Sequence, residues 1–143
     1  MPKIENCSWD DFLKGNHRIE PIGAVAIQIV DPGDTPPEPT EDVFHSRHVF
    51  EFLDAEEATS QFFPEHKLIS DEQAENIASI LIRALDEDRD VLVHCVAGIC
   101  RSGAVVEVAE MIGFYECFRY RHPNVRVKSK LMHQFDLLAL QSD

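Results

Sequence analysis

The chain has 143 residues, 26 of them acidic and 13 basic, and a formal net charge of −13 at pH 7. This length is typical of one domain that needs no disulfide or structural metal to build its core. The charge argues against a broad nucleic-acid-binding surface, because such surfaces neutralise phosphates with many cations.

No apolar run approaches the roughly 18 residues of a membrane span, and none follows Met1 as a signal peptide would. The four cysteines have no zinc-type spacing. We therefore expect a single cytoplasmic domain over residues 1–143, without a metal or other cofactor.

The amino-terminal half of the chain predicts one short helix and two strands. A serine N-cap and a terminal glycine bound a helix over residues 9–14, the first element that the pattern predicts. The apolar, β-branched run 24–30 is typical of a strand covered on both faces. A proline-rich and acidic stretch, 31–42, then predicts an exposed loop. Residues 48–54 alternate imperfectly and predict a second strand.

The carboxyl-terminal half predicts one more strand among several helices. A capping-box start and apolar residues at helical spacing predict a long helix over 70–85. Residues 90–95 predict a third strand, and 102–112, 114–121 and 129–140 predict helices. Alternating strands and helices predict an α/β fold, with a small, mostly parallel central sheet flanked by helices. Ligands bind such sheets beyond the carboxyl ends of the strands, where the third strand ends in a cysteine.

The third predicted strand runs directly into a loop of small residues and then into a helix. If this helix begins near Arg101, the loop N–H groups and the helix N-terminus surround the space in front of Cys95 and form an anion cradle. Ala97 and Gly98 allow close approach of the backbone, and the Arg101 guanidinium matches two phosphate oxygens. The positive electrostatic potential of these N–H groups, of the helix N-terminus and of Arg101 also stabilises a thiolate. The pattern thus predicts that Cys95 is a nucleophile that attacks phosphorus where it binds the phosphate.

The stretch VHCVAGICRSG, residues 93–103, resembles the signature of the cysteine-based protein tyrosine phosphatases. That signature is valine or isoleucine, then H-C-x-A-G-x-x-R, then serine or threonine, then glycine, and the chain matches all eight specified positions. The small size of the chain is similar to that of the compact dual-specificity branch. The resemblance implies a phosphatase-type strand–loop–helix active site in one phosphatase domain, and a reaction through a cysteinyl-phosphate.

The resemblance also implies a role for each matching residue. Cys95 would attack phosphorus, and Arg101 would bind the phosphoryl oxygens and stabilise the transition state. Ser102 would hydrogen-bond the sulfur, and His94 would help to set the acidity of the thiol. The substrate would bind the backbone amides of the loop: Val96, Ala97, Gly98, Ile99 and Cys100.

The general acid that such an enzyme needs is assigned less directly. In compact relatives an aspartate follows an apolar strand and an aromatic residue, and FEFLDAEEA fits this pattern at Asp54. Glu56 and Glu57 are close enough to compete for the role. Asp71 is better explained as an acid in the first turn of the long helix.

The expected activity is hydrolysis of phosphomonoesters in a phosphorylated protein or peptide, on tyrosine or with dual specificity. One alternative is a catalytically silent module that uses the same cradle to hold a phosphorylated partner. Another is a phosphatase for a phosphoinositide or an RNA 5′ end, although the loop has no lysine and the net charge is negative. Five basic residues between 115 and 133 could favour an anionic ligand, or could form an ordinary solvated face.

Overall fold

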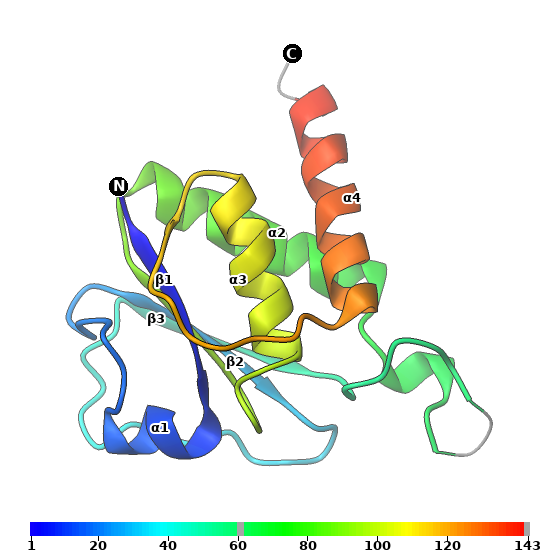
Figure 1. Cartoon of the computed structure of the whole chain (residues 1–143), viewed down its shortest axis with the longest axis horizontal. Coiled ribbons are helices and arrows are strands. Elements are labelled where there is room, and N and C mark those ends of the chain that lie inside the picture. The colour runs from blue at the N-terminus through cyan, green and yellow to red at the C-terminus, as the bar shows by residue number, and fades with distance from the viewer. Residues whose placement is uncertain (60–61, 142–143) are drawn as a thin grey trace.

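A single five-stranded sheet, with the strand order β3-β2-β4-β1-β5, forms the centre of the protein (Figure 1). The computed structural model describes residues 1–59 and 62–141. The strands are β1 (Lys3–Ser8), β2 (Val25–Val30), β3 (Ser46–Glu51), β4 (Val91–Cys95) and β5 (Tyr115–Glu116). The helices are α1 (Trp9–Lys14), the 3-10 helix η1 (Glu65–Lys67), α2 (Asp71–Asp86), α3 (Arg101–Met111) and α4 (Val125–Gln141). Every pairing within the sheet is parallel, which confirms the predicted α/β class.

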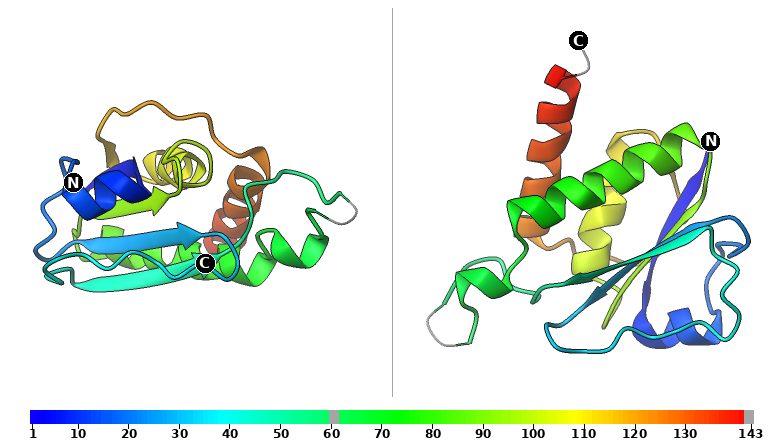
Figure 2. Two further views of the ribbon diagram at one scale, coloured as in Figure 1. Left: turned by 90° about the horizontal axis from the view of Figure 1, so that it is seen from below. Right: turned by 180° about the vertical axis from the view of Figure 1, so that it is seen from behind.

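Two apolar cores cover the two faces of the sheet. The larger one packs α2, α3 and α4 on residues such as Ile27 and Val93, whereas Phe12 of α1 packs with Leu92 in the smaller one. Figure 2 shows α1 on the other side of the strands from the three longer helices. Because both faces are covered, strands β2 and β4 are apolar almost throughout. No helix of the described residues is both long and apolar enough to cross a bilayer.

The long helix α2 confirms the prediction from its capping box. The Ser70 hydroxyl accepts the Gln73 N–H at 3.1 Å, and the Gln73 side chain accepts the Ser70 N–H at 3.0 Å. These reciprocal bonds satisfy two of the donors that a helix start leaves free. The buried side chains recur at helical spacing: Ala74, Ile77, Ala78, Leu81 and Ala84.

Strand β1 was not predicted, because polar residues occupy its centre. Glu5 and Asn6 are fully buried, and no apolar alternation indicates a strand there. The carboxylate of Glu5 is compensated by Arg119 at 2.9 Å. Beside β4, the strand places Ser8 in register with Cys95, so β1 forms one wall of the predicted cradle.

The predicted helix over residues 114–121 is wrong. Its first residues form β5, where Tyr115 N–H donates to Pro2 O at 2.8 Å and Cys117 N–H to Ile4 O at 3.0 Å. The backbone bonds extend the sheet instead of closing helical turns. Phe118 is 80% exposed, so the apolar residues here do not form one buried face.

Candidate active site

Cys95 ends β4, between β2 and β1, and its sulfur receives two polar contacts. The Gly98 N–H donates to Cys95 Sγ at 3.2 Å, and Ser102 Oγ lies 3.1 Å from the same sulfur. The side chain is almost completely buried. The Gly98 N–H can only donate to the sulfur, whereas the Ser102 hydroxyl can donate to it or accept from it. The structure therefore brings together the predicted nucleophile and the predicted hydroxyl partner.

The loop 96–100 is held by hydrogen bonds to its carbonyl oxygens. Four donors from neighbouring segments engage it: Trp9 N–H to Val96 O (3.2 Å), Asn6 Nδ2 to Gly98 O (2.7 Å), His122 N–H to Ile99 O (3.1 Å) and Asn124 N–H to Cys100 O (3.0 Å). These donors come from β1, from its junction with α1 and from the segment before α4. Because the C=O and N–H of a trans peptide point in opposite directions, these bonds direct the N–H groups of Ala97, Ile99, Cys100 and Arg101 away from the donors. The Gly98 N–H, whose own peptide carbonyl is that of Ala97, points at the Cys95 sulfur.

Gly98 allows the loop to lie directly on β1. Its φ is +76°, and a Cβ built there would lie 2.4 Å from both Cys7 C and Ser8 N. No side chain fits at that distance from backbone atoms, and an L residue is strained at positive φ. This close approach explains why the motif has glycine at position 98.

The N-terminus of α3 differs from those of α1 and α2. Ser8 caps α1 and Ser70 caps α2, and both helices have acids in the first turn. The N-cap of α3 is Cys100, whose side chain makes no capping hydrogen bond, and no acid lies in its first turn. The first N–H groups and the positive end of the helix dipole therefore have no side-chain cap and no acidic residue of the first turn beside them.

Arg101 is buried beside the loop, with only part of its guanidinium engaged. Its Nη1 donates to Asp31 Oδ1 at 2.7 Å and to Phe52 O at 2.8 Å. The residue is 4% exposed, and its Nε has no hydrogen-bond partner among the described residues. A buried N–H without an acceptor is costly, and a guanidinium can donate two parallel hydrogen bonds to an anion.

Asp54 lies at the rim of the same loop. The Asn124 side chain donates to Asp54 Oδ1 at 2.8 Å, while the Asn124 backbone holds Cys100. Burial raises the pKa of the Cys100 thiol, and the neighbouring Asp54 carboxylate raises it further. The structure therefore places the predicted general acid beside the loop.

The competing acids have other contacts. Glu56 accepts the Val125 N–H at 3.1 Å at the start of α4, and Glu57 is exposed. Asp71 bonds Lys130 at 2.7 Å, and this hydrogen bond lowers the pKa of Asp71. Asp71 is thus occupied in joining α2 to α4.

His94 is a buried, neutral imidazole. Burial lowers its pKa to about 4, although the Cys95 backbone opposes this shift. Its Nε2 lies 3.1 Å from Gln28 Nε2, and because the amide nitrogen is a donor, this ring nitrogen accepts. The ring also packs against Phe12, with 4.6 Å between centroids. Any effect of His94 on the thiol therefore comes from packing and hydrogen bonding, since the ring carries no charge at neutral pH.

Sequence reasoning missed three residues that support this site: Asn6, Gln28 and Asp31. Asn6 and Gln28 are polar residues inside strands, for which no pattern predicted a partner. Asp31 is the first residue of the predicted exposed loop over residues 31–42. It directly follows β2, and that position at the carboxyl end of a central strand was the available signal.

The predicted basic stretch is neutralised by the protein's own acids. Each of its five cations lies within ion-pair distance of at least one carboxylate: Arg119 with Glu5 and Asp11, Arg121 with Glu107 and Glu110, Arg126 with Glu65, Lys128 with Glu107 and Lys130 with Asp71. This segment therefore offers an anionic ligand much less positive field than its composition suggested.

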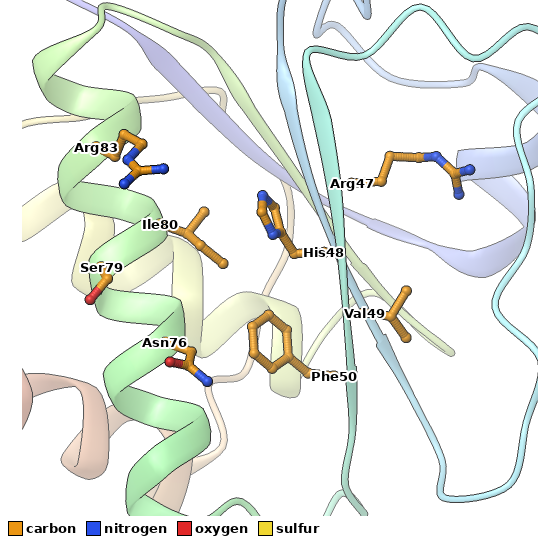
Figure 3. A pocket seen from close by; sticks show the side chains of 8 residues that line it. All are labelled: Arg47, His48, Val49, Phe50, Asn76, Ser79, Ile80 and Arg83. Atoms are coloured by element: carbon orange, nitrogen blue, oxygen red, sulfur yellow. The ribbon is translucent and has the colours of Figure 1, made fainter.

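A hollow of about 530 Å³ lies elsewhere, between edge strand β3 and α2. Figure 3 shows His48 and Phe50 pointing from β3 toward α2, and Arg47 and Val49 pointing away. Neither Cys95 nor Arg101 lines this hollow. Within residues 1–59 and 62–141, no three histidine, cysteine, aspartate or glutamate side chains are grouped as a metal site requires.

Comparison with known proteins identifies similar folds. The chain is similar to the human tyrosine phosphatase-like serine/threonine/tyrosine-interacting protein, with a TM-score of 0.62, 18% identity, and coverage of 98% of this chain and 95% of that one. It also matches Tk-PTP in the active form, with a TM-score of 0.48, 14% identity, and coverage of 95% and 93%. No protein-family model and no curated protein matches the sequence. The first likeness confirms the tyrosine-phosphatase-like fold that residues 93–103 predicted.

Proposed function

We propose that the protein is a cysteine-dependent phosphomonoester hydrolase of the protein tyrosine or dual-specificity type, which acts as a cytoplasmic domain over residues 1–143. The observation that carries the proposal is the surroundings of Cys95. Its sulfur meets the Gly98 N–H and the Ser102 hydroxyl in front of a helix start without a side-chain cap. Beside it, buried Arg101 has an Nε without a partner among the described residues. A thiolate and a phosphoryl group both fit this arrangement.

In the first step, the Cys95 thiolate attacks phosphorus, so that a P–S bond forms and the P–O bond to the leaving alcohol or phenol breaks. Asp54 gives its proton to the leaving oxygen, and Asn124 holds this carboxyl group at the rim. The loop N–H groups and Arg101 stabilise the charge on the equatorial oxygens. The products are a cysteinyl-phosphate and the free alcohol.

In the second step, water hydrolyses the cysteinyl-phosphate. Asp54, now a carboxylate, takes a proton from the water as its oxygen attacks phosphorus. The P–S bond breaks, inorganic phosphate leaves, and the Cys95 thiolate is restored. Ser102, 3.1 Å from the sulfur, donates a hydrogen bond from its hydroxyl to the departing thiolate, keeps its proton, and lowers the barrier.

A second candidate function is recognition of a phosphorylated partner without turnover. It is favoured by the likeness to a protein whose name describes it as phosphatase-like and interacting. The cradle would then bind the phosphate through the same N–H groups and Arg101. A phosphoinositide or an RNA end is a weaker candidate, because the basic residues near the loop are ion-paired.

Hydrolysis of p-nitrophenyl phosphate without added metal tests the first function. We expect turnover by the wild type, loss of turnover in Cys95→Ser, and a decrease of about 10²-fold in Asp54→Asn. Glu57→Gln is the matched control, because it removes a nearby exposed charge and should keep most of the rate. Circular dichroism checks that each variant folds. Turnover that survives in Cys95→Ser excludes this mechanism, whereas a folded, inactive wild type that binds vanadate supports the second function.

A further inference from the structure

The hollow between β3 and α2 is the middle part of a longer groove. A hollow of about 120 Å³ adjoins it toward the amino end of β3, and another of about 520 Å³ adjoins it toward the carboxyl end. Neighbouring hollows share lining residues: His48, Ile80 and Arg83 in the first case, and Val49, Phe50 and Asn76 in the second. We call the three hollows together the β3–α2 groove. Neither Cys95 nor Arg101 lines any of them, so the groove is separate from the candidate active site.

Strand β3 provides the groove with an unpaired backbone edge. It is the last strand of the sheet, and among the described residues it pairs only with β2. Apart from these bonds, its backbone makes one hydrogen bond within the described part of the chain, from Gln73 Nε2 to Glu51 O at 2.9 Å. The other N–H and C=O groups that point away from β2 have no partner among the described residues. Such an edge is a template on which another extended chain can form a strand.

The middle of the groove is positively charged, although the chain has 26 acidic and only 13 basic residues. None of the described aspartates and glutamates lines the 530 Å³ hollow. Arg83 is exposed there, and its guanidinium makes no ion pair or hydrogen bond with the described residues. Glu87, at the end of α2, bonds Arg89 at 2.8 Å instead. The positive charge of Arg83 is therefore available to a ligand.

Arg83 also faces into the groove. Figure 3 shows its guanidinium extending from α2 toward His48 of β3, with Ile80 beside it. Burial lowers the pKa of His48, and the charge of Arg83 lowers it further, as expected of two neighbouring side chains. Arg47 does not add to this charge, because it points away from α2 and bonds Asp42 at 3.2 Å. Since His48 is neutral at pH 7, the charge that a ligand meets in this hollow is that of Arg83.

The order of side chains along β3 defines what an added strand would meet. Alternate side chains of a strand share one face, and opposed residues of neighbouring strands lie about 4.5–5.5 Å apart. A side chain opposite His48 would lie next to Arg83, where a carboxylate fits. A side chain opposite Phe50 would lie on the apolar part of the hollow. Glu51 and Glu72 line the hollow beyond, so an acid is favoured only beside the arginine.

We propose that the β3–α2 groove binds an extended segment of another protein, which pairs with the free edge of β3 and places one carboxylate against Arg83. The segment has apolar residues two positions before and after this acid, so that one of them meets Phe50 whichever way the strand runs. A second copy of this chain is a poorer fit, because two-fold pairing of two β3 strands would bring two unpaired Arg83 side chains together. The inference goes beyond the proposed function and uses no residue of the active site.

The test uses three short, fluorescently labelled peptides of equal length, in which valine and threonine alternate. The first has glutamate at the central position of the valine face, the second has lysine there, and the third is the glutamate peptide with N-methyl groups on the amides that would pair with β3. In fluorescence anisotropy at low salt, we expect saturable binding of the glutamate peptide and about fivefold weaker binding of the lysine peptide, the upper range for one exposed ion pair. The N-methylated peptide should not bind. Equal binding of the glutamate and lysine peptides, binding of the N-methylated peptide, or no binding of the glutamate peptide would overturn the proposal.

A substitution in the groove assigns the preference to Arg83. Arg83→Gln should weaken binding of the glutamate peptide by up to about fivefold and remove the difference between the glutamate and lysine peptides. Lys3→Gln, at an exposed position of β1 outside the groove, makes the same change in net charge and should leave the difference unchanged. An equal effect of both substitutions would mean that only net charge matters, and would refute the role of Arg83.

Two further measurements separate the proposed occupant from others. Sedimentation velocity of the protein alone should show a monomer, and a dimer that the glutamate peptide dissociates would mean that a second copy occupies the groove. Cys95→Ser should bind the glutamate peptide as tightly as the wild type does, whether or not the wild type hydrolyses p-nitrophenyl phosphate. Weaker binding by this variant would place the peptide in the cradle. Either of these contrary results would overturn the proposal and leave the proposed function untouched.

Discussion

Gly98→Ala is expected to destabilise the protein more than a glycine replacement normally does. The new Cβ would lie 2.4 Å from Cys7 C and Ser8 N, at a φ of +76°. The left-handed conformation costs an L residue about 1–2 kcal/mol. The overlap with backbone atoms adds about 1–3 kcal/mol, as overpacking does. Together these give about 2–5 kcal/mol, a large part of the total stability of a domain.

Gly15→Ala is the matched control for this prediction. Gly15 has a φ of +72°, and a Cβ there would meet no atom within 4 Å. It should therefore show the conformational cost alone, about 1–2 kcal/mol. Urea unfolding of both variants measures the difference, and thermal unfolding should show a decrease of roughly 6–15 °C for Gly98→Ala. If the two variants lose the same stability, the loop does not lie against β1 as closely as described, and the steric argument is refuted.

Three further results are expected. Asn6→Ala should cost about 1–3 kcal/mol in urea unfolding, because it leaves the Gly98 and Tyr120 carbonyls without their donor; a loss below half of that would contradict the argument. The pKa of His94 is lowered to about 4 in the folded protein, so the unfolded chain takes up a proton there first, and stability should fall as pH decreases from 6.5 toward 4. Between pH 7 and pH 5 this amounts to about 2 kcal/mol, which a His94→Gln variant should lack when urea midpoints at the two pH values are compared; equal pH dependence would refute it. Ser70→Ala should weaken α2 by about 1 kcal/mol through loss of its cap, and an unchanged unfolding midpoint would show that the capping box contributes nothing.

Local sequence patterns correctly predicted those helices and strands whose secondary structure is determined by residues within the element itself. Residues 71–86 carry a capping box and a regular apolar stripe, so the helix follows from neighbouring positions alone. In contrast, β1 depends on partners far along the chain, since Glu5 needs Arg119 and Asn6 needs Gly98. No local rule shows that such polar residues will be buried together.

The same distinction applies to the candidate site. Cys95, Arg101 and Ser102 occur in one short motif with a known spacing, and their arrangement depends mainly on a strand, a loop and a helix start. The contact of Asp31 with Arg101 depends instead on how β2 lies beside β4. The close approach of Asp54 to the loop likewise requires Asn124, which lies far beyond both in the sequence.

The position of β1 has a consequence for the order in which the protein can be assembled during synthesis. β1 is made first, but its neighbours in the sheet are β4 and β5, which leave the ribosome much later. Until then Glu5 and Asn6 stay hydrated, because the arginine and the loop that compensate them do not yet exist. Contacts between such distant segments form late in folding. A half-made chain therefore contains no cradle, and the thiol of Cys95 gains its surroundings only when the last part of the sheet has been made.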